Sequence, residues 1–228
     1  MSPVLAFARQ NGWGQLLGRA SGGLQRRLRD GLVARQLGSP GFRVGRSPRL
    51  LGLDRMTIGP DFHAGDALWL EAVIQYAEGG AGAHYDPQLT IGCSTRLSDN
   101  VHIGCLHRVT IGDHLLCGSR VLISDHGHGR YRDADASDPA IPPAQRPLFS
   151  TAPVLIGNNV WLGDGVAVLA GAIIGDGCVI GANAVVTGLI PPGTLAVGAP
   201  ARGVRQWNAE ARTWLPLTMR NLPVSEPR

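Results

Sequence analysis

Apolar residues recur at every sixth position between residues 156 and 192. The series comprises Ile156, Leu162, Val168, Ile174, Ile180, Val186 and Pro192. Gly157, Gly163, Gly175 and Gly181 directly follow four of the apolar positions, and a small or apolar residue lies four positions after each of the first five. An amphipathic helix needs apolar residues three or four apart, and a half-buried strand needs alternation. A period of six predicts instead short strands joined by turns, with six residues forming one side of a coil.

The period also predicts how the coils are built. The repeated apolar residue is expected to point toward the coil axis, and the glycine after it to permit a tight corner. Successive coils would lie about 4.8 Å apart, as neighbouring strands do. Hydrogen bonds between coils would then satisfy the backbone along the whole stack. The repeat therefore predicts a parallel β-helix.

A weaker form of the repeat is present earlier in the chain. Its positions are Ile58, Ala64, Leu70, Ile91, Leu97 and Ile103, and then, after a shift of two residues, Ile111, Cys117 and Ile123. Residues 78–84 interrupt it with glycines and predict a turn or loop. Residues 124–153 interrupt it for longer and predict a loop extruded from the coils. Loops of that length in a compact array are usually functional.

These observations predict three parts. Residues 1–50 form a basic, partly helical extension, and residues 51–206 form the β-helix with its loop at 124–153. Residues 207–228 form a short helical segment that caps the stack. A cap is expected because the open end of a β-helix exposes unpaired backbone groups.

The N-terminal extension carries an unusual charge. Residues 1–50 hold nine arginines and one aspartate, a net charge of 9 − 1 = +8, whereas the whole chain carries +4 and the remainder therefore −4. One predicted helical stripe contains Leu17, Leu24, Leu28 and Leu32. Either the helix packs on the coils or a partner subunit, or residues 10–37 contact an anionic membrane surface. We favour packing, because three glycines weaken a long helix.

Other classes of protein are not expected. The sequence contains no run of 18 apolar residues, so we expect no membrane span, and it contains no recognisable secretory signal. The extension lacks the interleaved aromatic residues and the motifs of nucleic-acid binding. Four cysteines lack the spacing of a zinc site, and Cys117 and Cys178 fall on repeat positions as small buried residues. We therefore expect a cytoplasmic protein with no metal cofactor. Contact of residues 10–37 with the inner face of the membrane would be compatible with this location.

The repeat resembles that of the hexapeptide-repeat acyltransferases, whose fold is a left-handed parallel β-helix. The resemblance covers about residues 89–207. It is carried by PVLIGNNVWLGDG at residues 153–165, VIGANAVVTGLIPPG at 179–193 and VGAPARGVR at 197–205. These segments are similar to the sugar O-acetyltransferases, the branch that includes the maltose, galactoside, exopolysaccharide and O-antigen enzymes. The resemblance implies transfer from acetyl-CoA to a saccharide hydroxyl by a homotrimer with active sites between subunits.

The resemblance also implies a histidine general base, for which the loop offers two. A neutral imidazole within hydrogen-bond reach takes the hydroxyl proton as the oxygen attacks the thioester. Counting forward without a gap from residues 111–113 places the family's catalytic histidine on His128. Matching the polar residue and histidine that precede the loop places it on His126. We favour His128, with the other histidine orienting it or touching the acceptor and Asp125 fixing a tautomer.

Further site residues follow from the same resemblance. For coenzyme A it implies Trp161 beside the pantetheine arm, backbone amides at Gly163, Gly181 and Ala182, Thr187 near the nucleotide, and Arg202 and Arg205 on the phosphates. For the acceptor it implies Ser98, Asp99 and Asn100. The sequence departs from the family where Ser98 replaces an asparagine and where Gly188 replaces a basic residue.

The acceptor-binding segment that begins the maltose and galactoside enzymes has no counterpart here. We therefore expect a sugar of polysaccharide or lipid-linked glycan biosynthesis as the acceptor. Three alternatives stay open: an N-acetyltransferase acting on an amino sugar or serine-type acceptor, a carbonic-anhydrase-like β-helix with metal-binding histidines, and a non-catalytic scaffold.

Overall fold

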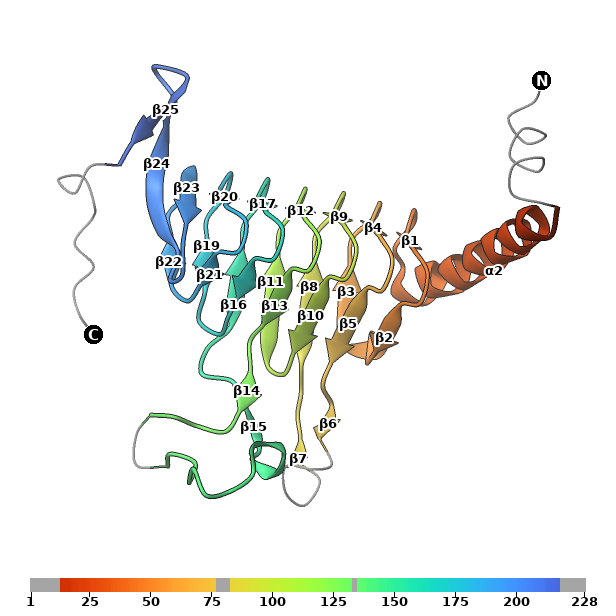
Figure 1. Ribbon diagram of the computed structural model, residues 1–228, viewed down its shortest axis with the longest axis horizontal. Helices are drawn as coiled ribbons and strands as arrows, with labels where there is room; N and C mark the ends of the chain where they lie inside the picture. Colours follow the sequence, from red (N-terminus) through yellow and green to blue (C-terminus); the bar gives the residue numbers. More distant parts are fainter. Residues whose placement is uncertain (1–12, 77–82, 133–134, 218–228) are drawn as a thin grey trace.

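The computed structural model describes residues 13–76, 83–132 and 135–217. The chain winds into a left-handed parallel β-helix, as predicted, with three sheets running along its length (Figure 1). Helix α2 (Trp13–Leu37) lies at one end, and an antiparallel pair of strands lies at the other. Two excursions leave the coils on one side, and they carry the strands β6, β7, β14 and β15.

Each sheet takes one strand from every coil it crosses. The nine-stranded sheet contains β1 (Arg43–Val44), β4 (His63–Ala64), β9 (Arg96–Leu97), β12 (Leu116–Cys117), β17 (Trp161–Leu162), β20 (Val179–Ile180), β23 (Thr194–Val197), β24 (Arg202–Asn208) and β25 (Thr213–Pro216). The first six-stranded sheet contains β2 (Arg49–Leu51), β5 (Trp69–Ala72), β10 (His102–Cys105), β13 (Leu122–Ser124), β18 (Ala167–Val168) and β21 (Val185–Val186). The second contains β3 (Met56–Ile58), β8 (Gln88–Ile91), β11 (Arg108–Ile111), β16 (Val154–Ile156), β19 (Ile173–Ile174) and β22 (Leu189–Ile190).

The strand register confirms the six-residue repeat. Leu162 pairs with Ile180, and Val168 pairs with Val186, in each case 18 residues on, which is three sides of six. Leu162, Val168 and Ile180 are each 0% exposed, as expected of residues that point toward the axis. Pro192 is the exception, because it is exposed. The last coil is shorter, so Ile190 pairs with Ile174 and is buried in place of the proline.

The glycines of the repeat serve close approach between coils. A Cβ added at Gly163 would lie 2.7 Å from the backbone nitrogen of Ala182 in the next coil. The left-handed backbone that we expected here lies two residues later, at Gly165 with φ 68° and at Asn183 with φ 59°. The corner therefore constrains two positions. At Gly163 there is no room for a side chain, and at Gly165 the backbone needs a positive φ.

The cysteines of the repeat are buried, as predicted. Cys117 and Cys178 are each 0% exposed in the core. Burial raises the pKa of both thiols, and it raises the pKa of Cys105 to about 12. Such thiols stay protonated at neutral pH and act as small apolar side chains.

The β-helix begins earlier than residue 51. Strand β1 pairs in parallel with β4, and β2 pairs in parallel with β5, so both belong to the sheets. Phe42 and Phe62 directly precede the paired strands β1 and β4, and their rings stack between the first two coils with centroids 5.1 Å apart. The buried residues of the first coil, Phe42 and Val44, are two positions apart, as Val160 and Leu162 are in a later coil.

The two excursions from the coils pack against each other. The first carries the antiparallel pair β6 (Gln75–Tyr76) and β7 (Ala83–His84), and the second carries β14 (Gly127–His128), β15 (Leu148–Phe149) and the short helix η2 (Pro143–Gln145). Their small core contains Val73, Leu106 and Leu148, with Tyr76 and Tyr85 against it. The tyrosine hydroxyls of the first excursion donate hydrogen bonds to the second. Tyr76 donates to the carbonyl of Ala144 at 3.0 Å, and Tyr85 donates to the carbonyl of Leu148 at 3.3 Å. The extruded loop is therefore an ordered structure.

The prediction of a helical cap at the C-terminal end was wrong for the residues described. Strand β24 pairs antiparallel with β23, and β25 pairs antiparallel with β24. A strand satisfies the open edge of β23 with hydrogen bonds, which a helix cannot do. The rings of Trp207 and Trp214 meet edge to face across these strands, with centroids 5.6 Å apart, and support the pair. Residues 218–228 of the predicted cap lie outside the described residues.

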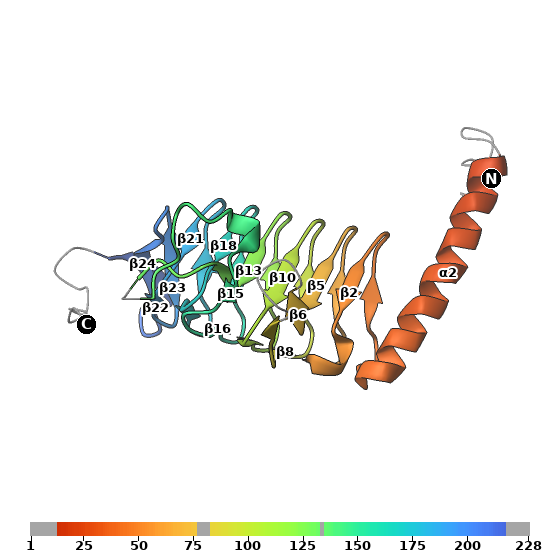
Figure 2. The ribbon, with the colours of Figure 1, turned by 90° about the horizontal axis from the view of Figure 1, so that it is seen from below.

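Helix α2 leans away from the N-terminal end of the stack (Figure 2). It continues through Gly23 and Gly31, although glycines were expected to weaken it. Val33, Ala34 and Leu37 in its last turns pack against the core. Arg29 also joins the helix to the first coil, because it donates to the carbonyl of Val44 at 2.7 Å. The other end of the helix extends beyond the coils.

Candidate active site

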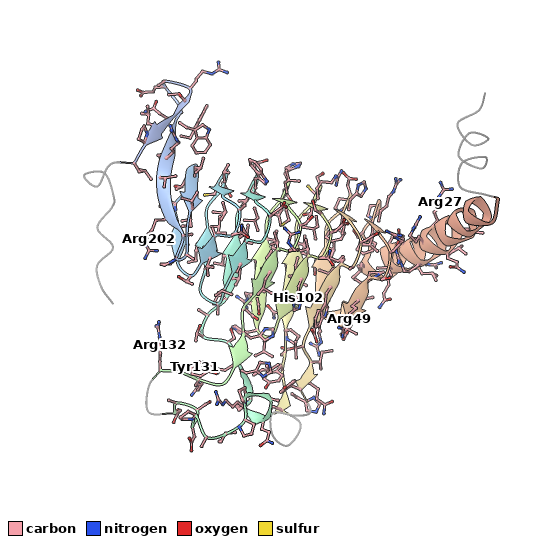
Figure 3. The ribbon with its side chains drawn as sticks, viewed as in Figure 1. Arg27, Arg49, His102, Tyr131, Arg132 and Arg202 are labelled. Atoms are coloured by element: carbon pink, nitrogen blue, oxygen red, sulfur yellow. The ribbon has the colours of Figure 1, made fainter. Side chains whose placement is uncertain are left out.

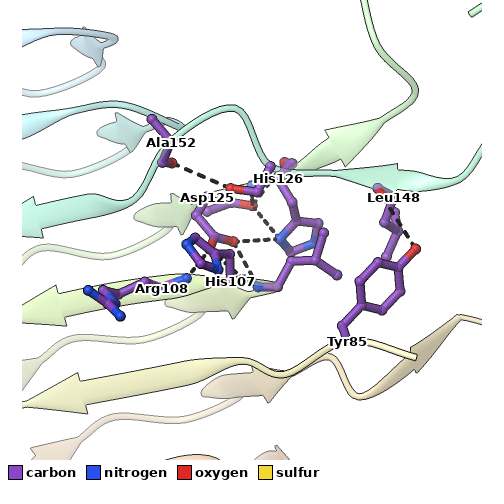
Figure 4. A network of polar contacts seen from close by, with 10 residues as sticks. Tyr85, His107, Arg108, Asp125, His126, Leu148 and Ala152 are labelled. Atoms are coloured by element: carbon purple, nitrogen blue, oxygen red, sulfur yellow. Dashed lines mark hydrogen bonds and ion pairs between the residues drawn. The ribbon is translucent and has the colours of Figure 1, made fainter. Parts of the chain in front are cut away.

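The chain leaves the sheet directly after β13, where Asp125 forms the centre of a polar network (Figure 4). The Asp125 side chain is 0% exposed. Its carboxylate accepts three backbone N–H groups of the facing corner, from Leu106 at 2.8 Å, His107 at 2.8 Å and Arg108 at 2.7 Å. A carboxylate with this many donors can be buried without an unsatisfied charge.

Opposing effects set the protonation of this carboxyl group. Burial raises the pKa of Asp125, whereas the hydrogen bonds from His126 and from the three backbone N–H groups lower it. The bonds prevail and hold the pKa below its ordinary value, so Asp125 is ionised at neutral pH. The group at the base of this corner is therefore a buried anion.

His126 lies against this anion. Its Nδ1 is 3.1 Å from Oδ1 of Asp125 and 3.3 Å from the hydroxyl of Ser124. Because an ionised carboxylate only accepts, Nδ1 carries the proton and Nε2 keeps a free lone pair. The side chain is 16% exposed, so its orientation is held while one edge reaches the surface. This arrangement of carboxylate and imidazole fixes both the tautomer and the direction of a basic nitrogen.

His128, the base favoured from sequence, has a different environment. It lies on β14, opposite Leu148 of β15, and is exposed. Its ring meets that of Tyr76 edge to face, with centroids 5.4 Å apart. The carboxylate contact expected of a catalytic histidine is therefore found at His126, and His128 contributes to the contact between the two excursions.

Three stacked side chains lead to His126 along the six-stranded sheet that contains β2, β5 and β10. Sequence analysis did not identify this stack. The Arg49 guanidinium lies 4.0 Å from the ring centre of Trp69, which stacks on His102 at 4.1 Å. Figure 3 shows Arg49 and His102 on the same side of the β-helix. The available signal was the register, since Arg49, Trp69 and His102 occupy equivalent positions of successive coils.

Gly104 separates His102 from His126. A Cβ at Gly104 would lie 3.1 Å from Cε1 of His126 and 3.4 Å from Nε2 of His102. Among the described residues, this Nε2 is buried without a hydrogen-bond partner. Burial first, and then the charges of His126 and Arg49, lower the pKa of His102. His102 is therefore a neutral imidazole with an unused polar atom beside the Asp125–His126 pair.

The residues implied for coenzyme A gather mostly on another side. Trp161 lies on β17 of the nine-stranded sheet and is 51% exposed. Gly163, Gly181 and Ala182 form the corners after β17 and β20, and the exposed Arg202 and Arg205 lie on β24 of the same sheet, whereas Thr187 follows β21 in the sheet that contains β13. In Figure 1, β17 and β20 are on the opposite side of the coils from β14. One chain therefore does not bring Trp161 to His126.

The residues implied for the acceptor lie in a corner between coils. Ser98, Asp99 and Asn100 follow β9, and Asn100 has φ 58°. Asp99 accepts the backbone N–H of Asp66 at 2.7 Å, so its carboxylate links adjacent coils. These residues follow a strand of the nine-stranded sheet, whereas His126 follows a strand of a six-stranded sheet. The structure does not bring them together within one chain.

The part of the chain that the structure describes lacks two further features. No group of three or more histidine, cysteine, aspartate or glutamate side chains is arranged to hold a metal ion there. No helix in that part is both long and apolar enough to cross a membrane.

Comparison with known proteins identifies the repeat. Residues 153–188 match the family described as "Bacterial transferase hexapeptide (six repeats)". The chain is 49% identical over 88 residues to a putative lipopolysaccharide biosynthesis O-acetyl transferase, WbbJ, of Escherichia coli K12, covering 38% of this chain and 44% of that one. It is 50% identical over 56 residues to the galactoside O-acetyltransferase of the same organism, covering 25% and 28%. The aligned regions thus span less than half of these curated relatives.

Two solved structures resemble part of the chain. The hexapeptide-repeat acetyltransferase VCA0836 of Vibrio cholerae, complexed with acetyl coenzyme A, is 25% identical and covers 76% of this chain and 74% of its own, with a TM-score of 0.47. The maltose O-acetyltransferase of Clostridium difficile 630 is 26% identical and covers 78% and 74%, with a TM-score of 0.44.

Proposed function

We propose that this chain, of which residues 153–188 match the bacterial transferase hexapeptide family, is an acetyl-CoA-dependent O-acetyltransferase acting on a saccharide. The observation that carries the proposal is the buried Asp125 carboxylate, which accepts from Nδ1 of His126 at 3.1 Å and leaves Nε2 as a base. The names of the relatives, one from lipopolysaccharide biosynthesis and one acting on galactosides, support a sugar hydroxyl as acceptor.

The proposed reaction uses His126 in both directions. Nε2 takes the proton of the acceptor hydroxyl as its oxygen forms a bond to the thioester carbonyl carbon. The carbon–sulfur bond then breaks, and His126 returns the proton to the departing thiolate of coenzyme A. Asp125 stabilises the imidazolium between these steps, because its charge is 3.1 Å from Nδ1. The proposed reaction needs neither a metal ion nor a covalent bond between the acetyl group and the enzyme.

His102 is proposed to hold the acceptor. His102 and His126 face each other over Gly104, which has no side chain of its own: a Cβ there would lie 3.1 Å from Cε1 of His126 and 3.4 Å from Nε2 of His102. The buried Nε2 of His102 would gain the hydrogen bond that it lacks within the described chain. A buried polar atom that is satisfied only by the correct substrate favours that substrate over one that lacks the hydroxyl.

We assign the coenzyme A site to two neighbouring copies of the chain. Trp161 lies on the nine-stranded sheet and His126 lies beside a six-stranded one, so a single chain separates the proposed acyl-binding and basic residues. A homotrimer would bring the His126 side of one subunit against the Trp161 side of the next. Arg202 and Arg205, both exposed on β24, would bind the phosphates.

The test measures release of coenzyme A thiol from acetyl-CoA with a panel of neutral saccharides and the corresponding amino sugars. We expect turnover with a neutral saccharide, and a loss of about a hundred- to ten-thousand-fold in kcat for His126→Ala. The matched control is His114→Asn, at an exposed corner with φ 59°, a backbone that asparagine tolerates. Preference for amino sugars would indicate an N-acetyltransferase, and no response to acetyl-CoA would end the proposal.

A further inference from the structure

Helix α2 has two apolar faces, and the β-helix covers only one of them. Val33, Ala34 and Leu37 pack against the core. The second face consists of Leu24, Leu28 and Leu32, which are 61%, 62% and 72% exposed. We call these three leucines the outer stripe. Exposed leucines so close together in a water-soluble helix indicate a surface that is covered in use.

The outer stripe is straight, and the coils leave it exposed. Its members are four residues apart, so they lie on one side of the helix and extend along about 12 Å of it. Figure 2 shows α2 leaving the stack at the N-terminal end, with its far end beyond the coils. A flat surface can therefore reach the stripe without meeting the coils at that end.

Positive charge accompanies the outer stripe. Arg27 and Arg35 are exposed on the same helix, and Figure 3 shows Arg27 along the middle of α2. The charge of Arg29 is already paired, because its guanidinium forms an ion pair with Asp30 at 2.8 Å and donates to the carbonyl of Val44. Across the chain, residues 1–50 carry +8 and the remainder −4. An anionic surface would attract this end and repel the rest, which orients the molecule.

We propose that the outer stripe and its arginines dock on the surface of a bilayer that contains anionic lipid. The leucines would enter the boundary between headgroups and acyl chains, and the arginines would contact the headgroup phosphates. A second copy of α2 is a poorer partner, because three leucines supply a small part of the roughly 800 Å² per side of a stable interface. Two such helices would also bring their arginines together.

The test is flotation of the full chain with phosphatidylcholine vesicles, with and without phosphatidylglycerol. We expect binding to the phosphatidylglycerol vesicles, and at least tenfold weaker binding for the triple variant Leu24→Ser, Leu28→Ser and Leu32→Ser. The control is Leu189→Ser, which removes a leucine that is 66% exposed at the other end of the β-helix. Arg27→Gln with Arg35→Gln should weaken binding and make it less sensitive to salt, because surface charges are screened by ions.

Three results would overturn the proposal. The first is a wild-type chain that does not float with phosphatidylglycerol vesicles, and the second is a triple serine variant that binds them as well as Leu189→Ser does. The third is a triple variant with a changed oligomeric state and unaltered flotation, which would identify the stripe as a contact between copies. Thermal unfolding and acetyl-CoA binding of each variant establish that it is folded, since α2 lies outside the proposed active site.

Discussion

At the scale of single residues, Asp125 connects the fold to the chemistry. It holds the corner at residues 106–108 through three backbone N–H groups and also orients His126. The same side chain therefore contributes to stability and to the direction of the basic nitrogen. Removing its charge should affect both, and the two effects can be measured separately.

Asp125→Asn should lower the free energy of unfolding by about 2–3 kcal/mol at neutral pH, because a charged hydrogen bond contributes roughly 1.5–3 kcal/mol. An amide also directs its NH2 group at a backbone donor. The pKa of Asp125 is lowered in the folded protein, so its stabilisation is present above the unfolded carboxyl pKa of about 3.9. It is lost as the pH falls from there through the folded pKa.

Chemical denaturation of wild type and Asp125→Asn across pH measures this effect. The difference in unfolding free energy should be constant from about pH 5 to 7 and should narrow below about pH 4. A difference that stays unchanged down to the lowest accessible pH would mean that the Asp125 charge does not stabilise the corner.

At the scale of the elements, close contact between coils limits the repeat more than corner geometry does. Several repeat glycines face the backbone of the next coil, as Gly163 faces Ala182. Gly188 differs, because a Cβ there would meet nothing within 4 Å and its backbone is not in the left-handed region. The two glycines form a matched pair for testing the cost of a methyl group between coils.

Gly163→Ala should destabilise the protein by about 1–3 kcal/mol, the usual range for overpacking against atoms that cannot move away. Gly188→Ala should be neutral or stabilising by up to about 1 kcal/mol, because alanine restricts the unfolded chain. Urea denaturation of both variants gives the comparison. Equal effects at the two positions would refute the close-contact explanation of the repeat.

The sequence period predicted the coils well and the site only in part. It identified Leu162 and Ile180 as core residues, since a period of six is itself the geometry of the coil. It favoured His128 over His126 as the base, because the carboxylate contact of His126 depends on backbone groups of residues 106–108 that the sequence does not place. The neighbourhood of His102 was missed for a related reason. Its contacts are with other coils, 33 residues away at Trp69 and 24 at His126 by sequence number.

At the scale of the whole molecule, the proposed functional residues are distributed over different sides of one rod. The proposed general base, His126, lies beside a six-stranded sheet, and Trp161 lies on the nine-stranded sheet. The outer stripe of α2 is at the N-terminal end, and the strand cap is at the C-terminal end. Separate sides leave room for neighbouring subunits along the rod and for another surface at its end.

Mixing two inactive chains tests whether an active site needs two subunits. His126→Ala and Trp161→Ala would each be inactive alone. In randomly mixed homotrimers about a quarter of the sites would receive His126 from one chain and Trp161 from the next. Co-expression should therefore restore about a quarter of wild-type turnover per site. Mixed protein that stays inactive would place both residues of a site in the same chain.

The identity of the base is the centre of this account, and comparing His126→Ala with His128→Ala tests it most directly. The measurement is acetyl-CoA turnover by each variant, together with its affinity for coenzyme A. We predict that His126→Ala lowers kcat by at least about a hundredfold with coenzyme A affinity retained, and that His128→Ala lowers it by less than about tenfold. The reverse order, with both variants folded, would contradict the assignment of Asp125 and His126 as the catalytic pair.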